Sequence, residues 1–99
     1  MKIIQTLVNC VDFQTRIIEV DTDWNTFKEK ILSNIYNGIS DDEFPVKKSY
    51  PIGKGLMFQK AKWFEVNQDD DCHLDITFTP NHSACGNQDE RVCFLVLEE

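Results

Sequence analysis

The sequence has little glycine and proline, no long apolar run and few basic side chains. Four glycines and three prolines in 99 residues exclude a collagen-like or low-complexity chain. No apolar run approaches the roughly 20 residues that span a membrane, so no membrane contact is expected. Residues 1–6 also lack the apolar core of a signal peptide, so we expect a soluble, cytoplasmic protein.

Basic side chains are outnumbered by acidic ones. Ten Lys and Arg residues face seventeen Asp and Glu residues, which gives a formal net charge of -7. This charge argues against nucleic acid as a partner and favours another protein with a basic surface. The alternative is that the charge only keeps a small protein soluble. The length and the 41% hydrophobic content predict one folded domain over residues 1–99.

Apolar periodicity predicts a hairpin followed by a helix. Residues 2–10 and 15–20 are rich in apolar and β-branched types and are too short for helices, so they predict two strands. Apolar residues then recur at three- and four-residue spacings, which predicts a helix with Thr22 or Asp23 as its N-cap and Gly38 as its terminator. The apolar stripe of this helix consists of Trp24, Phe27, Ile31, Leu32 and Ile35.

The second half of the chain predicts strands. Residues 39–55 carry prolines, glycines and charges, so they predict irregular structure, and 56–66 predict a bulged strand or two short ones. A turn over 67–71 and a half-buried strand over 74–78 follow. Residues 92–97 are apolar on both parities, which predicts a central strand covered on both faces.

Three segments resemble the ubiquitin-like superfamily: Met1-Lys2-Ile3-Ile4-Gln5-Thr6-Leu7, Phe27-Lys28-Glu29-Lys30-Ile31 and Phe94-Leu95-Val96-Leu97. The resemblance implies an α+β, ubiquitin-like β-grasp fold, with one main helix on one face of a mixed sheet of four or five strands. The last strand would lie parallel to the first. It also implies a protein-interaction module without catalysis that binds through the sheet face away from the helix, at Ile4 and Val8 with Trp63. The ending Leu97-Glu98-Glu99 lacks the two glycines of a conjugated modifier.

An acidic segment also resembles the Phox/Bem-type branch of this superfamily. An aromatic strand containing Trp63 runs into Asp69, Asp70 and Asp71, and Asp75 follows in the next strand. Such domains pair an acidic segment with a basic patch on another copy, so self-association is an alternative, but here three adjacent aspartates replace the spaced acidic signature and its glycine. The lysines that would meet an acidic partner are Lys47, Lys48, Lys60 and Lys62.

Metal-ligand residue types are present without metal-ligand spacing. The aspartates of 69–71 do not follow a calcium-loop pattern, so they predict a solvated turn. Cys72-His73, His82-x-x-Cys85 and Cys93 are zinc-ligand types, yet no C-x-x-C pair occurs. We therefore expect no metal, no cofactor and free thiols, and the function predicted is not enzymatic.

Two other functions remain open. A small acidic inhibitor of phage or viral type would use its carboxylates to block a basic or nucleic-acid-binding surface of a target, which the charge of -7 allows. An enzyme would use a Cys-His pair, in which an imidazole lowers the pKa of the thiol.

Overall fold

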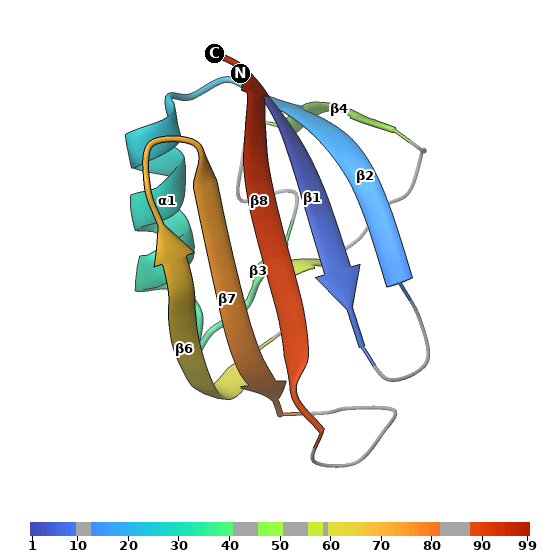
Figure 1. Cartoon of the computed structure of the whole chain (residues 1–99), viewed down its shortest axis with the longest axis vertical. Helices are drawn as coiled ribbons and strands as arrows, with labels where there is room; N and C mark the ends of the chain where they lie inside the picture. The colour runs from blue at the N-terminus through green and yellow to red at the C-terminus, as the bar shows by residue number, and fades with distance from the viewer. Residues whose placement is uncertain (10–12, 41–45, 51–55, 59, 82–87) are drawn as a thin grey trace.

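The chain forms a six-stranded antiparallel sheet with helix α1 packed on one of its faces (Figure 1). The computed structural model describes residues 1–9, 13–40, 46–50, 56–58, 60–81 and 88–99, and the backbone alone for 46–50 and 56–58. The sheet order is β4-β2-β1-β8-β7-β6, and β3 pairs with β5 in a separate ribbon. The elements are β1 Lys2–Val8, β2 Phe13–Val20, α1 Trp24–Ser33, β3 Ile39–Ser40, β4 Val46–Tyr50, β5 Leu56–Phe58, β6 Ala61–Asp69, β7 His73–Pro80 and β8 Glu90–Glu98.

The last strand lies beside the first, but it runs in the opposite direction. Ile3 lies opposite Val96 and Leu7 lies opposite Val92 in an antiparallel register. The predicted parallel pairing is wrong, and so is the mixed sheet. The reason is that β6, β7 and β8 follow one another as antiparallel neighbours, so the direction of β8 depends on that of β7. The apolar pattern of a strand carries no information about its direction. The fold is α+β with an antiparallel sheet.

Helix α1 begins where the sequence predicts and ends earlier. Asp23 is the N-cap, and its carboxylate accepts a hydrogen bond from the Thr26 amide at 2.7 Å. The helix ends at Ser33, where the side chain of Asn34 donates to the Lys30 carbonyl oxygen at 2.8 Å. Gly38 does have a positive φ of 74°, but it follows a further turn after the helix. No helix in the described ranges is long and apolar enough to cross a membrane.

Two predicted irregular segments contain strands. Residues 39–55 include β3 and β4, and β4 joins the main sheet, which has six strands among the described residues instead of the four or five expected. The predicted turn over 67–71 is wrong at its start, because β6 continues to Asp69 and the chain turns at 70–72. Residues 56–66 do divide into two strands, β5 and β6, but β6 is not short, since it has nine residues and continues to Asp69.

The core lies between α1 and the inner face of the sheet. Phe27 of the helix meets Phe94 of β8 edge to face, with ring centroids 5.3 Å apart. Ile3, Ile18 and Ile76 contribute from the neighbouring strands and are fully buried. Residues opposite one another in an antiparallel sheet project from the same face. The register therefore fixes which side chains project from the other face, away from the helix.

Candidate interaction surface and polar cluster

The sheet face away from α1 carries a row of apolar side chains across its three central strands. Ile4 of β1 lies opposite Ile17 of β2 on one side and opposite Leu95 of β8 on the other. Leu95 in turn lies opposite His73 of β7. Neighbouring strands are about 4.8 Å apart, so side chains in such a row contact one another.

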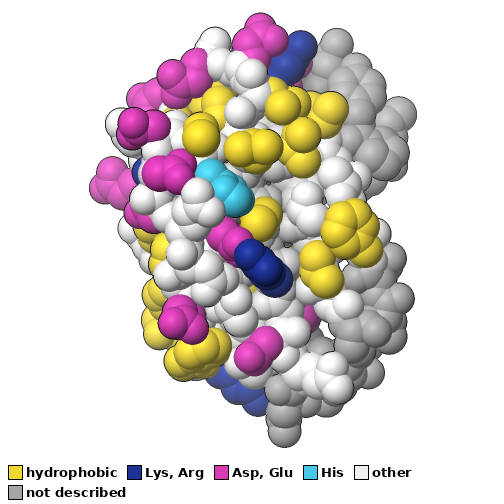
Figure 2. Space-filling view, in the orientation of Figure 1, with side chains coloured by type: hydrophobic (Ala, Val, Ile, Leu, Met, Phe, Trp, Pro, Cys, Tyr) yellow, Lys and Arg dark blue, Asp and Glu magenta, His cyan; other side chains and the backbone are white. Residues whose placement is uncertain are grey.

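Ile4, Ile17 and Leu95 form part of a larger group of exposed and half-buried apolar side chains, which we call the outer apolar patch. Ile17 is 38% exposed, Leu95 40% and Phe13 66%, values far above those of the inner positions. Figure 2 shows hydrophobic side chains gathered on this face, beside acidic, basic and histidine side chains. The outer apolar patch consists of Ile4, Val8, Phe13, Ile17, Leu95 and Leu97.

The patch corrects one prediction about β8. The strand is central, as predicted, since β1 and β7 flank it. Its inner residues Val92 and Phe94 are fully buried, but Leu95 is exposed and Cys93 is only half-buried. The predicted cover on both faces is wrong among the described residues, because α1 covers only the inner face. The apolar residues on the inner face of β8 therefore lie in the core, whereas those on its outer face are partly exposed to solvent.

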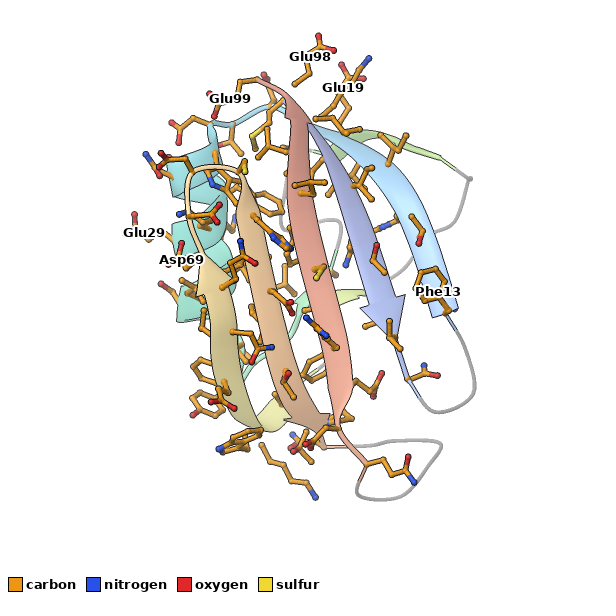
Figure 3. The ribbon with its side chains drawn as sticks, viewed as in Figure 1. Phe13, Glu19, Glu29, Asp69, Glu98 and Glu99 are labelled. Atoms are coloured by element: carbon orange, nitrogen blue, oxygen red, sulfur yellow. The ribbon has the colours of Figure 1, made fainter. Side chains whose placement is uncertain are left out.

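Carboxylates lie at one end of the patch, where the two chain termini meet. Glu19, Glu98 and Glu99 project at this end of the sheet (Figure 3). Lys2 lies between them in the register and is 4.0 Å from the Glu98 carboxylate, with both side chains largely exposed. The patch thus has an apolar centre and a mostly acidic rim at this end.

A buried carboxylate lies beside the patch on the same face. Asp75 of β7 is 3% exposed, and it accepts hydrogen bonds from Arg91 Nε at 2.8 and 3.1 Å and from Arg91 Nη2. The Arg91 guanidinium lowers the pKa of the Asp75 carboxyl, against the desolvation that raises it. Asp75 in turn raises the pKa of Arg91. Asn67 Nδ2 adds a longer contact of 3.4 Å.

Asp75 is one of three potential metal ligands that lie close together on this face. The ligand atoms of His73, Asp75 and Cys93 all lie within 4.8 Å of one another. Burial raises the pKa of the Cys93 thiol, and the neighbouring Asp75 charge raises it further. A catalytic cysteine needs the opposite shift, because the thiolate is the nucleophile. The raised pKa therefore argues against a Cys-His nucleophile, while the case for a metal site rests on the convergence of the three ligand atoms alone.

The predicted acidic segment is exposed at Asp69, Asp70 and Asp71, and two of these carboxylates also make contacts within the molecule. Asp69 is paired with Lys28 of the helix at 2.5 Å, and the Asp70 carboxylate accepts from the backbone amides of Cys72 and His73. A hydrogen bond from Gln68 and these amides lower the pKa of Asp70 to about 2. Asp71 is exposed. Asp69 and Asp70 thus hold the β6–β7 turn, and Asp75 belongs to the polar cluster.

The other predicted partner-binding residues are dispersed. Ile4 and Val8 lie in the outer apolar patch, whereas Trp63 is 46% exposed on the distant strand β6. Lys60 and Lys62 are exposed near the start of β6. The side chains of Lys47 and Lys48 lie outside the described part of the chain, as do the metal-ligand candidates His82 and Cys85.

Sequence reasoning missed several patch residues. Phe13 and Ile17 share the outward parity of β2 with the polar residues Thr15 and Glu19, and Leu95 and Leu97 were assigned to a covered strand. Their shared face follows only from the register between β2, β1 and β8. The signal in the sequence is that Phe13 and Ile17 lie an even number of positions apart in one strand, so they project from the same face.

Comparison with known proteins assigns this chain to no family. No protein-family model, curated protein or solved structure matches this chain.

Proposed function

We propose that this protein is a non-catalytic protein-interaction module that docks through the outer apolar patch. The observation that supports this most strongly is the row formed by Ile17, Ile4 and Leu95, in which Ile17 and Leu95 are exposed and Ile4 is half-buried. Contiguous exposed apolar side chains on a soluble domain typically mark an interaction site. The proposal rests on this face and does not require the ubiquitin-like resemblance.

The partner we infer is a different protein with an apolar centre and a basic rim. The chain carries a net charge of -7, and Glu19, Glu98 and Glu99 lie at the end of the patch. A basic rim would pair with these carboxylates and raise the association rate, while the apolar centre would supply most of the affinity. Two copies of this chain would bring like charges together, which disfavours self-association.

The test combines a patch variant with a matched control. Leu95→Asp places a charge in the centre of the patch, whereas Tyr36→Asp changes an exposed aromatic residue that contacts Phe64 away from the patch. We expect a partner to crosslink to the wild type and to Tyr36→Asp at a defined stoichiometry, and not to Leu95→Asp. Circular dichroism checks that both variants stay folded. Equal recovery of the same partner by all three proteins would refute docking through this patch.

The acidic inhibitor is a second candidate, favoured by the charge of -7. It differs from a docking module in what happens to the partner after binding. If the partner captured in the experiment above is an enzyme or a nucleic-acid-binding protein, an inhibitor suppresses its activity at a 1:1 ratio. A docking module leaves that activity intact.

A further inference from the structure

The polar cluster beside the patch places three different metal-ligand types on two rigid strands. Asp75 of β7 and Cys93 of β8 lie directly opposite each other in the register. His73 precedes Asp75 by two residues, so it projects from the same face. The ligand atoms of the three side chains already lie within 4.8 Å of one another.

We propose that His73, Asp75 and Cys93 form a zinc site. A sulfur, a nitrogen and a carboxylate oxygen form a donor set typical of zinc, and three protein ligands leave a fourth position for water. Zinc–ligand distances of roughly 2.0–2.3 Å place tetrahedral ligand atoms about 3.3–3.8 Å apart. The three atoms already lie within 4.8 Å of one another, and small rotations of His73 and Cys93, both half-buried, bring them into that range.

Arg91 is the neighbour that this site must accommodate. Its guanidinium binds both oxygens of Asp75, and Asn67 also approaches one of them. A carboxylate has about four lone-pair positions, and the bonds from Arg91 and Asn67 occupy all of them, so a metal at Asp75 would replace the 3.4 Å contact from Asn67, the longest of these bonds. With Asp75 and a Cys93 thiolate, the two negative charges offset part of the charge of zinc beside Arg91. Arg91 then acts as the outer-shell partner that orients the carboxylate.

Zinc binding exchanges a proton for the metal. A cysteine side chain without a metal carries its proton at neutral pH, so Cys93 is a thiol before zinc binds. When zinc binds, the S–H bond breaks, a Zn–S bond forms and the proton passes to the solvent. No atom is oxidised or reduced. The fourth position faces away from the core, because the site lies on the sheet face that α1 does not cover.

The sequence supplies a matched pair of cysteine variants for the test. Cys93→Ser removes a proposed ligand, while Cys72→Ser removes an exposed thiol next to His73 that is outside the proposed set. Zinc binding to the purified full chain is measured by calorimetry, and cobalt(II) reports thiolate ligation by its charge-transfer absorption. We expect wild type and Cys72→Ser to bind one zinc ion alike. Cys93→Ser should bind at least about tenfold more weakly, since losing outer-shell partners alone costs roughly 10–100-fold.

Two further variants keep the test informative if Cys93→Ser is poorly folded. His73→Gln changes a half-buried surface ligand and should weaken zinc binding by a similar factor. Arg91→Met removes the neighbouring cation. Because this variant keeps the three ligands, bound cobalt should still show the charge-transfer absorption of a thiolate ligand. Equal zinc binding by wild type, Cys93→Ser and His73→Gln, or the absence of stoichiometric binding to the wild type, would overturn the site. This test uses the isolated chain, so its failure leaves the docking proposal untouched.

Discussion

The indole Nε1 of Trp24 donates a hydrogen bond to the carbonyl oxygen of Asp70 at 2.9 Å, which joins the first residue of α1 to the β6–β7 turn. Lys28, one turn later in the helix, donates to the same carbonyl at 3.0 Å and lies 5.5 Å from the centre of the Trp24 ring. The Trp24 side chain is almost fully buried. A polar turn and a buried aromatic residue thus fix the helix against one edge of the sheet.

The hydrogen bond of Trp24 can be tested separately from its packing. Trp24→Phe keeps an aromatic ring in the core and removes the indole donor, so we expect a loss of about 1–2 kcal/mol in the free energy of unfolding. Lys28→Met is the comparison, because it removes the contacts of the ammonium group with Asp69, the Asp70 carbonyl and the Trp24 ring but leaves the indole bond in place, and it should cost less than about 1 kcal/mol. Urea denaturation measures both. A loss from Lys28→Met that equals the loss from Trp24→Phe would contradict this assignment.

The N-cap of α1 predicts a pH-dependent contribution to stability. Hydrogen bonds from Thr26 lower the pKa of Asp23 below its ordinary value of 3.8. A lowered pKa means that the cap stabilises the folded state above pH 3.8 and loses this effect as the pH falls through the folded pKa. Asp23→Ser keeps a capping oxygen without a titrating group. The melting temperature of the wild type should therefore fall more steeply below this pH than that of the serine variant.

The Asp75–Arg91 pair predicts unequal effects of its two single variants. Asp75 is buried, whereas the Arg91 side chain is 58% exposed. Arg91→Met leaves a buried carboxylate without its main partner and should cost about 2 kcal/mol of unfolding free energy. Asp75→Asn leaves an arginine that can turn to solvent, so it should cost less. Chemical denaturation of both variants and the double variant gives the coupling energy, and a larger cost for Asp75→Asn would contradict this account.

Local patterns were sufficient to predict most elements of the fold. The apolar stripe from Trp24 to Ile31 predicts the helix, because helical geometry places residues at this spacing on one face. Asp23, one of the two N-cap candidates, is the N-cap in the structure. Strand direction was not predictable, since Ile3 and Val96 would be buried in either a parallel or an antiparallel pair. Strand β4 was missed because its sequence, with two lysines and a serine, has little apolar alternation.

The candidate site was less predictable because it depends on register between distant segments. Ile4 was predicted from the ubiquitin-like resemblance, but its neighbours Ile17 and Leu95 join it only through pairing. Asp75 and Cys93 are 18 positions apart in the sequence and become direct neighbours across β7 and β8. Sequence spacing alone detects ligand sets within a loop or a helix, and it does not detect a set assembled across strands.

Substitutions on the two faces of β8 are expected to lower stability by unequal amounts. Phe94 is fully buried, and Phe94→Ala should cost about 3–5 kcal/mol because it leaves a cavity in the core. Leu95, the next residue, is 40% exposed in the outer apolar patch, so Leu95→Ser should change stability by no more than about 1 kcal/mol. Thermal denaturation monitored by circular dichroism compares the two. A large loss for Leu95→Ser would show that something covers the patch.

A buried glutamate at the start of β8 predicts that the protein can be stabilised. Glu90 is 4% exposed, and among the described residues its Oε1 has no hydrogen-bond partner. Burial raises the pKa of Glu90 above its ordinary value of 4.5, against a hydrogen bond with Asn9 that lowers it. A raised pKa means that the folded state is favoured below pH 4.5 and loses this contribution as the pH rises through the folded pKa.

Glu90→Gln keeps the shape of this side chain and removes the charge that burial penalises. We expect the variant to be more stable than the wild type by about 1 kcal/mol at pH 7, with the difference shrinking as the pH falls toward 4.5. Urea denaturation across this pH range measures it. The exposed Glu29→Gln on the helix is the matched control, because it removes the same charge without relieving burial and should show no such trend. A Glu90→Gln protein that is less stable at pH 7 would instead mean that the ionised carboxylate is stabilised in the folded state.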